Sequence, residues 1–137
     1  MQIITENVSS KMQRDITKKT RVLSSENHKI KDMQDIINDL CKAWETLDAE
    51  LIIKHLDNDF IYDSQWVLYS LNCNQYKEYI QGKFKTLKNN GIQIKASIID
   101  DPYIRGTMLK LNQNGNIYYY RIKIVDDKVI KADMCMF

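Results

Sequence analysis

The spacing of apolar positions predicts three helices in the first two thirds of the chain. The first covers residues 29–47, where the apolar positions share one helical face. Asp48 has the position of a cap for a short second helix, and Asn74 that of a cap for a third, which ends at Asn90–Gly91. The apolar face of the first helix consists of Met33, Ile36, Ile37, Leu40, Cys41, Trp44 and Leu47. The third has a buried stripe of Tyr76, Tyr79, Ile80, Phe84 and Leu87, and we expect Lys77, Lys83, Lys85 and Lys88 on its solvent side.

The remaining segments have the alternating pattern of strands. Phe60–Asp63 reads as a strand in which Phe60 and Tyr62 share one face. From residue 92 onward apolar and polar positions alternate, with hairpin turns at Asn114–Gly115 and Asp126–Asp127. Helices with one strand among them, followed by an antiparallel meander, are typical of the α+β class. We therefore expect three N-terminal helices packed on one face of a curved antiparallel sheet.

Length and charge narrow the range of functions. The 137 residues suffice for one domain, which we assign to residues 29–137. Residues 1–28 have only a loose apolar repeat and an excess of basic side chains, so we expect an N-terminal arm or a weakly packed helix there. The net charge of +2 is too small to indicate nucleic-acid binding, and no apolar run is long enough to span a membrane. Three cysteines without paired spacing, and no secretory signal pattern, favour free thiols and a cytoplasmic location.

Four segments resemble the nuclear-transport-factor-like superfamily, also called SnoaL-like or cystatin-like in fold. They are Trp44–Asp48, Leu56–Trp66, Tyr79–Phe84 and Ile130–Met134, within a resemblance that covers about residues 30–137. The sequence looks most like a bacterial branch without known chemistry. The resemblance implies a cone-shaped fold with a pocket. It does not imply a reaction, since members of the superfamily include isomerases, dehydratases, transport factors and binding domains.

The catalytic members of this fold that resemble ketosteroid isomerase need a carboxylate base and two donors that stabilise an enolate. The resemblance places the base position on Ser64 and the first donor position on Leu40. The second donor position falls on Tyr119 or Tyr120. A serine hydroxyl is no base near neutral pH without a partner, so this resemblance implies a pocket without that chemistry.

Two acidic residues leave an enzyme alternative open. Strand alternation points Asp63 away from Phe60 and Tyr62, so it is either a surface carboxylate or, with a bulge at Tyr62, a pocket acid. Asp133 in the last strand either pairs with Arg121 or Lys123 on a neighbouring strand or serves as a pocket acid. An isomerase or dehydratase using Asp63 or Asp133 is the alternative to a binding domain.

No cofactor is expected, and no metal site. His28 and His55 are far apart and lack ligands at metal-binding spacing, and no glycine-rich phosphate loop is present. Cys41 lies on a predicted buried helix face and Cys135 in the final strand, where both are expected to be packing residues.

The aromatic residues are the best candidates for a binding site. Trp44, Tyr62, Trp66 and the run Tyr118–Tyr119–Tyr120 are expected to converge on the concave side of the fold, and tyrosine and tryptophan carry polar groups that need partners. We expect a pocket for a small hydrophobic or aromatic molecule or a peptide, lined by Trp44, Tyr62, Ser64, Trp66, Tyr119, Asp63 and Asp133. Apolar side chains on both faces of the strand Ile117–Val125 also predict a homodimer through the sheet, and a pure assembly module is a further alternative.

Overall fold

The computed structural model describes residues 32–99 and 107–136. The chain divides into two units at Gln34–Asp35, and the fold is that of the second unit, Asp35–Phe137. The arm predicted for residues 1–28 lies outside the described residues.

A helix runs through residues 32–46 and is followed by the short helix α2 (Glu50–Ile53). The Asp48 carboxylate accepts a hydrogen bond from the backbone N–H of Glu50 at 3.1 Å, at the start of α2. The long strand β1 (Leu56–Ser64) comes next. Leu56 begins this strand soon after α2 ends. The backbone N–H of Val129 donates to the carbonyl of His55 at 2.8 Å and ties the segment to the sheet.

The helix α3 (Cys73–Asn89) follows the two-residue strand β2 (Leu71–Asn72), which the sequence pattern did not predict. Asn72 caps α3, and not Asn74 as expected. The Asn72 side chain accepts from the backbone N–H of Gln75 at 2.9 Å, while the Gln75 side chain accepts from the backbone N–H of Asn72, also at 2.9 Å. This reciprocal pair is a capping box, in which both orphan donors are satisfied. The helix ends at Asn90 and Gly91 as predicted, with Gly91 at a φ of 68°.

Four strands complete the fold: β3 (Ile94–Ile99), β4 (Thr107–Gln113), β5 (Asn116–Val125) and β6 (Lys128–Cys135). Both predicted hairpin turns are present, with positive φ at Asn114–Gly115 and at Asp126–Asp127. These are the backbone angles that two-residue hairpin turns require, and Asn, Gly and Asp are the residues that adopt them most readily.

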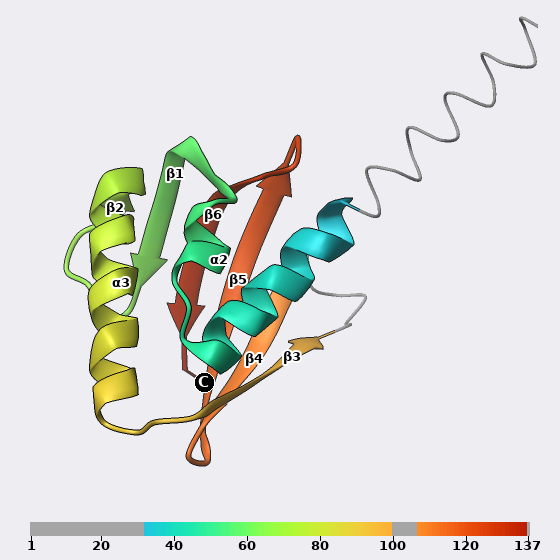
Figure 1. Cartoon of the computed structure of the whole chain (residues 1–137). Helices are drawn as coiled ribbons and strands as arrows, with labels where there is room; N and C mark the ends of the chain where they lie inside the picture. The colour runs from blue at the N-terminus through green and yellow to red at the C-terminus, as the bar shows by residue number, and fades with distance from the viewer. Residues whose placement is uncertain (1–31, 100–106, 137) are drawn as a thin grey trace, which may run out of the picture. The chain divides into compact units, whose positions relative to one another are not determined.

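The sheet is mixed, which corrects the expectation of a purely antiparallel one. Its order is β2-β1-β6-β5-β4-β3, and the central pair β1–β6 is parallel while every other pair is antiparallel. The expectation of three N-terminal helices holds only in part, because β1 and β2 precede α3 in the chain. Figure 1 shows the open, curved sheet.

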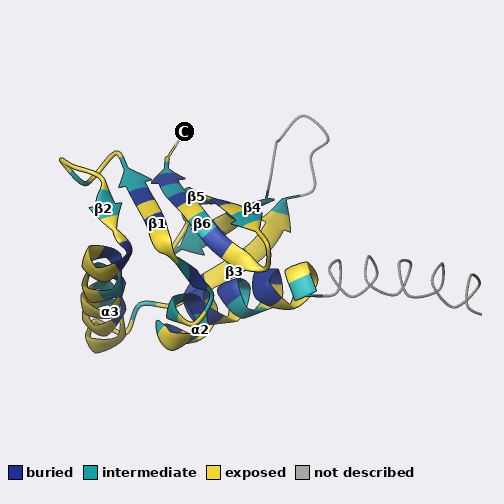
Figure 2. Cartoon of the chain, turned by 90° about the horizontal axis from the view of Figure 1, so that it is seen from above, coloured by how far each residue is buried: buried dark blue, intermediate teal, exposed yellow. Residues whose placement is uncertain are grey.

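All helices of this unit cover the same face of the sheet, as the single apolar stripe on each had indicated (Figure 2). Phe60 and Tyr62 of β1, Tyr120 and Ile122 of β5, and Ala132 of β6 point into this inner face and are almost fully buried. The residues between them in each strand point to the outer face. Burial therefore alternates along the central strands, and this alternation decides which candidate residues reach the interior.

Candidate functional site

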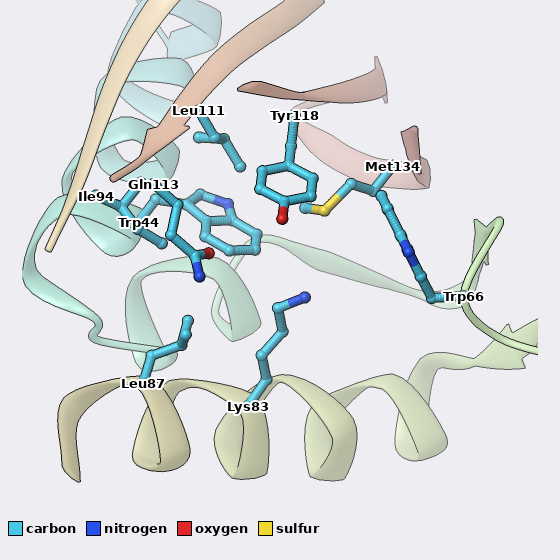
Figure 3. Close-up of a pocket in the computed structure, with 9 residues that line it drawn as sticks. All are labelled: Trp44, Trp66, Lys83, Leu87, Ile94, Leu111, Gln113, Tyr118 and Met134. Atoms are coloured by element: carbon cyan, nitrogen blue, oxygen red, sulfur yellow. The ribbon is translucent and has the colours of Figure 1, made fainter. Parts of the chain in front are cut away.

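A cavity of about 210 Å³ lies between the inner face of the sheet and α3 (Figure 3). Its walls come from every layer of the unit: the helix over residues 32–46, the loop after β1, α3, and strands β3 to β6. The lining combines four purely apolar side chains with five polar or amphipathic ones. The lining residues are Trp44, Trp66, Lys83, Leu87, Ile94, Leu111, Gln113, Tyr118 and Met134.

Trp44 forms the inner wall of the cavity. Its side chain is only 2% exposed, and its indole ring packs edge-on against Phe84 (centroids 4.8 Å apart) and Tyr120 (5.3 Å). The indole N–H of Trp44 is buried without a hydrogen-bond partner, the one side-chain group in this state among the described residues. A buried donor left unpaired costs about 1–3 kcal/mol.

Lys83 reaches the cavity from α3, which corrects the expectation that it lies on the solvent side of that helix. Tyr79, Lys83 and Leu87 are spaced by four residues, so they form one half-buried stripe beside the fully buried Tyr76–Ile80–Phe84 stripe. The ammonium group of Lys83 lies 5.8 Å from the centroid of the Tyr79 ring. Within the described part of the chain no carboxylate forms a salt bridge with Lys83.

Trp66 stands at the cavity edge, on the loop after β1. The residue is 47% exposed, and its ring packs edge-on against Tyr118, with the centroids 5.5 Å apart. The hydroxyl of Ser64 accepts a hydrogen bond from the backbone N–H of Trp66 at 3.1 Å. Ser64, the residue at the expected base position, therefore shapes the turn that carries Trp66 and does not line the cavity.

The three consecutive tyrosines of β5 have three different environments. Tyr118 is half-buried and lines the cavity. Tyr120 points to the same face but lies deeper, where its hydroxyl is 2.8 Å from that of Tyr76. Tyr119 points to the outer face, opposite Cys135 of β6. The sequence left open whether Tyr119 or Tyr120 points inward, and in the structure it is Tyr120. The tyrosine that reaches the cavity is Tyr118.

Tyr62 belongs to the packed core and not to the cavity lining. It is 1% exposed and its ring lies 4.6 Å from that of Tyr76 and 5.6 Å from that of Tyr79. Burial raises the pKa of Tyr62 well above its usual value, and the neighbouring Tyr79 adds to this shift. The pKa values of Tyr76 and Tyr120 are raised as well, in each case mainly by burial.

Asp63 and Asp133 both point to the outer face of the sheet, away from the cavity. The Asp63 carboxylate accepts a hydrogen bond from the Ser70 hydroxyl and lies 3.9 Å from the ammonium group of Lys131. The Asp133 carboxylate accepts from Nε of Arg121 at 2.7 Å, as one of the two sequence interpretations proposed. No bulge turns Asp63 inward, because the β1–β6 register is regular from Ile61 to Ser64.

Of the seven residues predicted to line a pocket, the structure brings Trp44 and Trp66 to the cavity. The sequence did not predict Lys83 or Gln113 in the lining, and Tyr118 was expected on the concave side but not among the lining residues. The four-residue spacing from Tyr79 to Lys83 to Leu87, which places the three side chains on one helical face, is the signal in the sequence for the position of the lysine. Gln113 had no comparable signal, since it sits at the end of β4 next to a hairpin turn.

The cysteines, histidines and helices bear on the expectations about thiols, metal sites and membrane spans. The three cysteines are free thiols. Among residues 32–99 and 107–136, no group of three or more His, Cys, Asp and Glu side chains is placed to hold a metal ion. His55 pairs with Asp39 at 2.8 Å, and His28 lies outside the described residues. None of the described helices has the length and apolar character needed to cross a membrane.

A mixed sheet with all helices on its inner face, and a cavity between the two layers, defines a class of α+β pocket folds. Comparison with solved structures shows which known proteins share this fold. A SnoaL-like protein of unknown function from Burkholderia thailandensis has a TM-score of 0.63 at 14% identity, over 76% of this chain and 93% of that one. An NTF2-like protein from Anabaena variabilis has a TM-score of 0.59 at 10% identity, over 79% and 88% of the two chains.

A third structure, an NTF2-like protein of unknown function from Cytophaga hutchinsonii, has a TM-score of 0.51 at 10% identity, over 76% and 88% of the two chains. No protein-family model and no curated protein matches the sequence. The chain therefore has the fold that SnoaL-like and nuclear-transport-factor-like (NTF2-like) proteins share, and the resemblance predicted from the sequence is confirmed at the level of the fold.

Proposed function

We propose that this protein binds a small, largely apolar molecule in the cavity beside Trp44. The observation that carries the proposal is the cavity itself, whose walls include three aromatic side chains, one of them the buried Trp44 with an unpaired indole N–H. Buried polar groups in folded proteins are paired in the great majority of cases, so the unpaired N–H marks the wall beside Trp44 as incompletely satisfied.

The size and walls of the cavity support a small ligand. Its volume of about 210 Å³ exceeds the roughly 150 Å³ of an apolar cavity that holds benzene. Three aromatic side chains, Trp44, Trp66 and Tyr118, border it together with the aliphatic residues Leu87, Ile94 and Leu111. Flat aromatic surfaces and a few polar groups are the usual composition of a small-molecule site.

An enzymatic function has less support. The alternative isomerase or dehydratase relied on Asp63 or Asp133, and both carboxylates lie on the far face of the sheet with partners of their own. A general acid or base must come within hydrogen-bond reach of its substrate, which neither does for a molecule in the cavity.

The proposal is tested by intrinsic fluorescence. The chain has two tryptophans, so Trp66→Phe leaves Trp44 as the only reporter. We expect at least one member of a panel of single-ring compounds (benzyl alcohol, phenylacetamide, phenethylamine and phenylacetate) to change the Trp44 emission saturably. Leu87→Phe, which fills the cavity, should abolish the change, whereas Leu68→Phe at an 86% exposed site should not. A flat titration for every compound would overturn the proposal, as would a change that survives Leu87→Phe.

A further inference from the structure

The polar groups around the cavity are biased toward hydrogen-bond donors. The ammonium group of Lys83 and the indole N–H of Trp44 can only donate, while the hydroxyl of Tyr118 and the amide of Gln113 can donate or accept. No Asp or Glu lines this cavity in the part of the chain that the structure describes. The electrostatics of the lining therefore favour an anionic group on the bound molecule.

Lys83 supplies the charge. Its side chain rises from α3 into the same space that Tyr118 and Gln113 enter from the sheet, so that three polar ends face one another across the cavity (Figure 3). The ammonium group lies over the ring of Tyr79, 5.8 Å from its centroid. A half-buried cation that has an aromatic face but no carboxylate partner among the described residues can still gain a charged hydrogen bond from a ligand.

The rest of the cavity is suited to an apolar body and not to a second charge. Leu87, Ile94, Leu111 and Met134 supply aliphatic and thioether surface, and the rings of Trp44, Trp66 and Tyr118 supply aromatic surface. A phosphate or sulfate ion alone would leave this surface unfilled, whereas a single aromatic ring fits within a volume of about 210 Å³. One ring with a short acidic arm satisfies both conditions.

We propose that the natural ligand class is a small organic acid, a single-ring aromatic carboxylate, whose carboxylate lies against Lys83 and whose ring packs among Trp44, Trp66 and Tyr118. This inference rests on the proposed binding function and specifies its ligand. One carboxylate oxygen would accept from Lys83, and the Tyr118 hydroxyl is a further donor that enters the same cavity.

The experiment compares phenylacetate with phenylacetamide, which has the same shape without the charge. Both are titrated at pH 7 into the Trp66→Phe protein, with calorimetry on the unaltered protein as a second readout. We expect the carboxylate to bind about tenfold more tightly than the amide, the order expected for one charged hydrogen bond. Raising the salt concentration should weaken phenylacetate binding more than phenylacetamide binding.

Variants of Lys83 assign the preference to one residue. Lys83→Met keeps an unbranched side chain and should bring phenylacetate down to the affinity of the amide, while the affinity for the amide changes less than twofold. Lys83→Arg should retain the preference for the acid. Lys85→Met, at an exposed position of the same helix, is the matched control and should behave like the parent protein.

The outcomes separate the two proposals. Equal binding of the acid and the amide, or a preference for the acid that survives Lys83→Met, overturns the organic-acid inference while the binding function stands. If no compound of the panel binds, the binding function itself fails. A melting temperature for Lys83→Met within a few degrees of the parent shows that lost affinity reflects the lost charge and not unfolding.

Discussion

The hydroxyl groups of Tyr76 and Tyr120 lie 2.8 Å apart in the core, where α3 packs on β5. Both side chains are fully buried, so each hydroxyl depends on the other for a hydrogen bond. Phe60, Tyr62 and Trp44 surround the pair with aromatic rings. This contact joins the helical layer to the sheet directly behind the wall of the cavity.

Removing one hydroxyl of this pair should cost more than removing both. We expect Tyr120→Phe to lower the free energy of unfolding by about 1–3 kcal/mol, because it leaves the Tyr76 hydroxyl buried and unpaired. The double variant Tyr76→Phe with Tyr120→Phe should recover part of this loss, since both buried groups are then apolar. Urea denaturation of the two single variants and the double variant measures the coupling. Strictly additive losses would contradict the pairing.

The buried tyrosines also predict a loss of stability at alkaline pH. Burial raises the pKa of Tyr62, Tyr76 and Tyr120 in the folded state, while in the unfolded state each ionises near pH 10. The stability that these groups contribute is therefore complete below about pH 10 and is lost as the pH rises above it. Each such tyrosine should add a slope of about 1.4 kcal/mol per pH unit.

Denaturation curves between pH 8 and pH 11 measure this loss, and absorbance near 295 nm follows tyrosinate formation. The chain has eight tyrosines, and we expect the buried three to ionise only when the protein unfolds. The Tyr76→Phe, Tyr120→Phe double variant is the control and should show a shallower slope. An unchanged slope would mean that other groups cause the alkaline loss.

Much of the fold could be predicted because local patterns determine it. The two hairpin turns, the end of α3 at Gly91 and the inward direction of Phe60 and Tyr62 follow from turn chemistry and strand alternation. The two-residue strand β2 has no pattern of its own, because its pairing depends on the β1 strand that it meets in space. The parallel pairing of β1 with β6 is likewise a tertiary property.

The candidate site was harder to predict than the fold. A shift of one residue in the assumed position of β5 reverses which tyrosines face inward, so the sequence left Tyr119 and Tyr120 unresolved. For Lys83, charge favours solvent while helical spacing places it on the face that also carries Tyr79 and Leu87. Lysine can bury its aliphatic stem while its ammonium group stays polar, so its position on a half-buried stripe was compatible with the lining of a cavity.

The cap of α3 gives a prediction with a built-in control. Asn72→Ala removes the acceptor for the backbone N–H of Gln75 and should cost about 1 kcal/mol of stability. Asn74, which the sequence pattern favoured as the cap, lies inside the first turn, so Asn74→Ala should change stability by less than about 0.5 kcal/mol. Thermal and urea denaturation compare the two variants. The reverse order would show that the helix begins after Asn74.

Homodimer formation through the sheet remains a prediction. On the outer face of β5, the half-buried Ile117 and Tyr119 precede the charged Arg121 and Lys123. An apolar end of the outer face is suited to a second copy of this chain, and the charged end is not. Sedimentation should show a dimer at high micromolar concentration, and Ile117→Lys should shift it toward monomer. A monomer throughout that range would contradict the prediction.

The last prediction is that the protein does not catalyse proton transfer of the ketosteroid-isomerase type. Ser64 occupies the expected base position and its hydroxyl accepts from the backbone of Trp66, while Leu40 occupies the position of one enolate donor. General-base catalysis typically contributes about a hundredfold to ten-thousandfold, and it requires a base that reaches the substrate. We therefore expect the wild type to convert a generic enolisable ketone at the background rate.

Two variants make this expectation decisive. Asp63→Asn should leave the background rate unchanged, because the Asp63 carboxylate lies on the outer face against Ser70 and Lys131. If the wild type turned the ketone over and Asp63→Asn abolished that turnover, Asp63 would be a catalytic base and the binding-only interpretation would fail.

The second variant, Ser64→Asp, places a carboxylate on the same face of β1 as the inward-pointing Phe60 and Tyr62. If activity appears only in this variant, the base is the one catalytic group that the wild type lacks. If the variant binds the ketone but stays inactive, the enolate donors are missing as well.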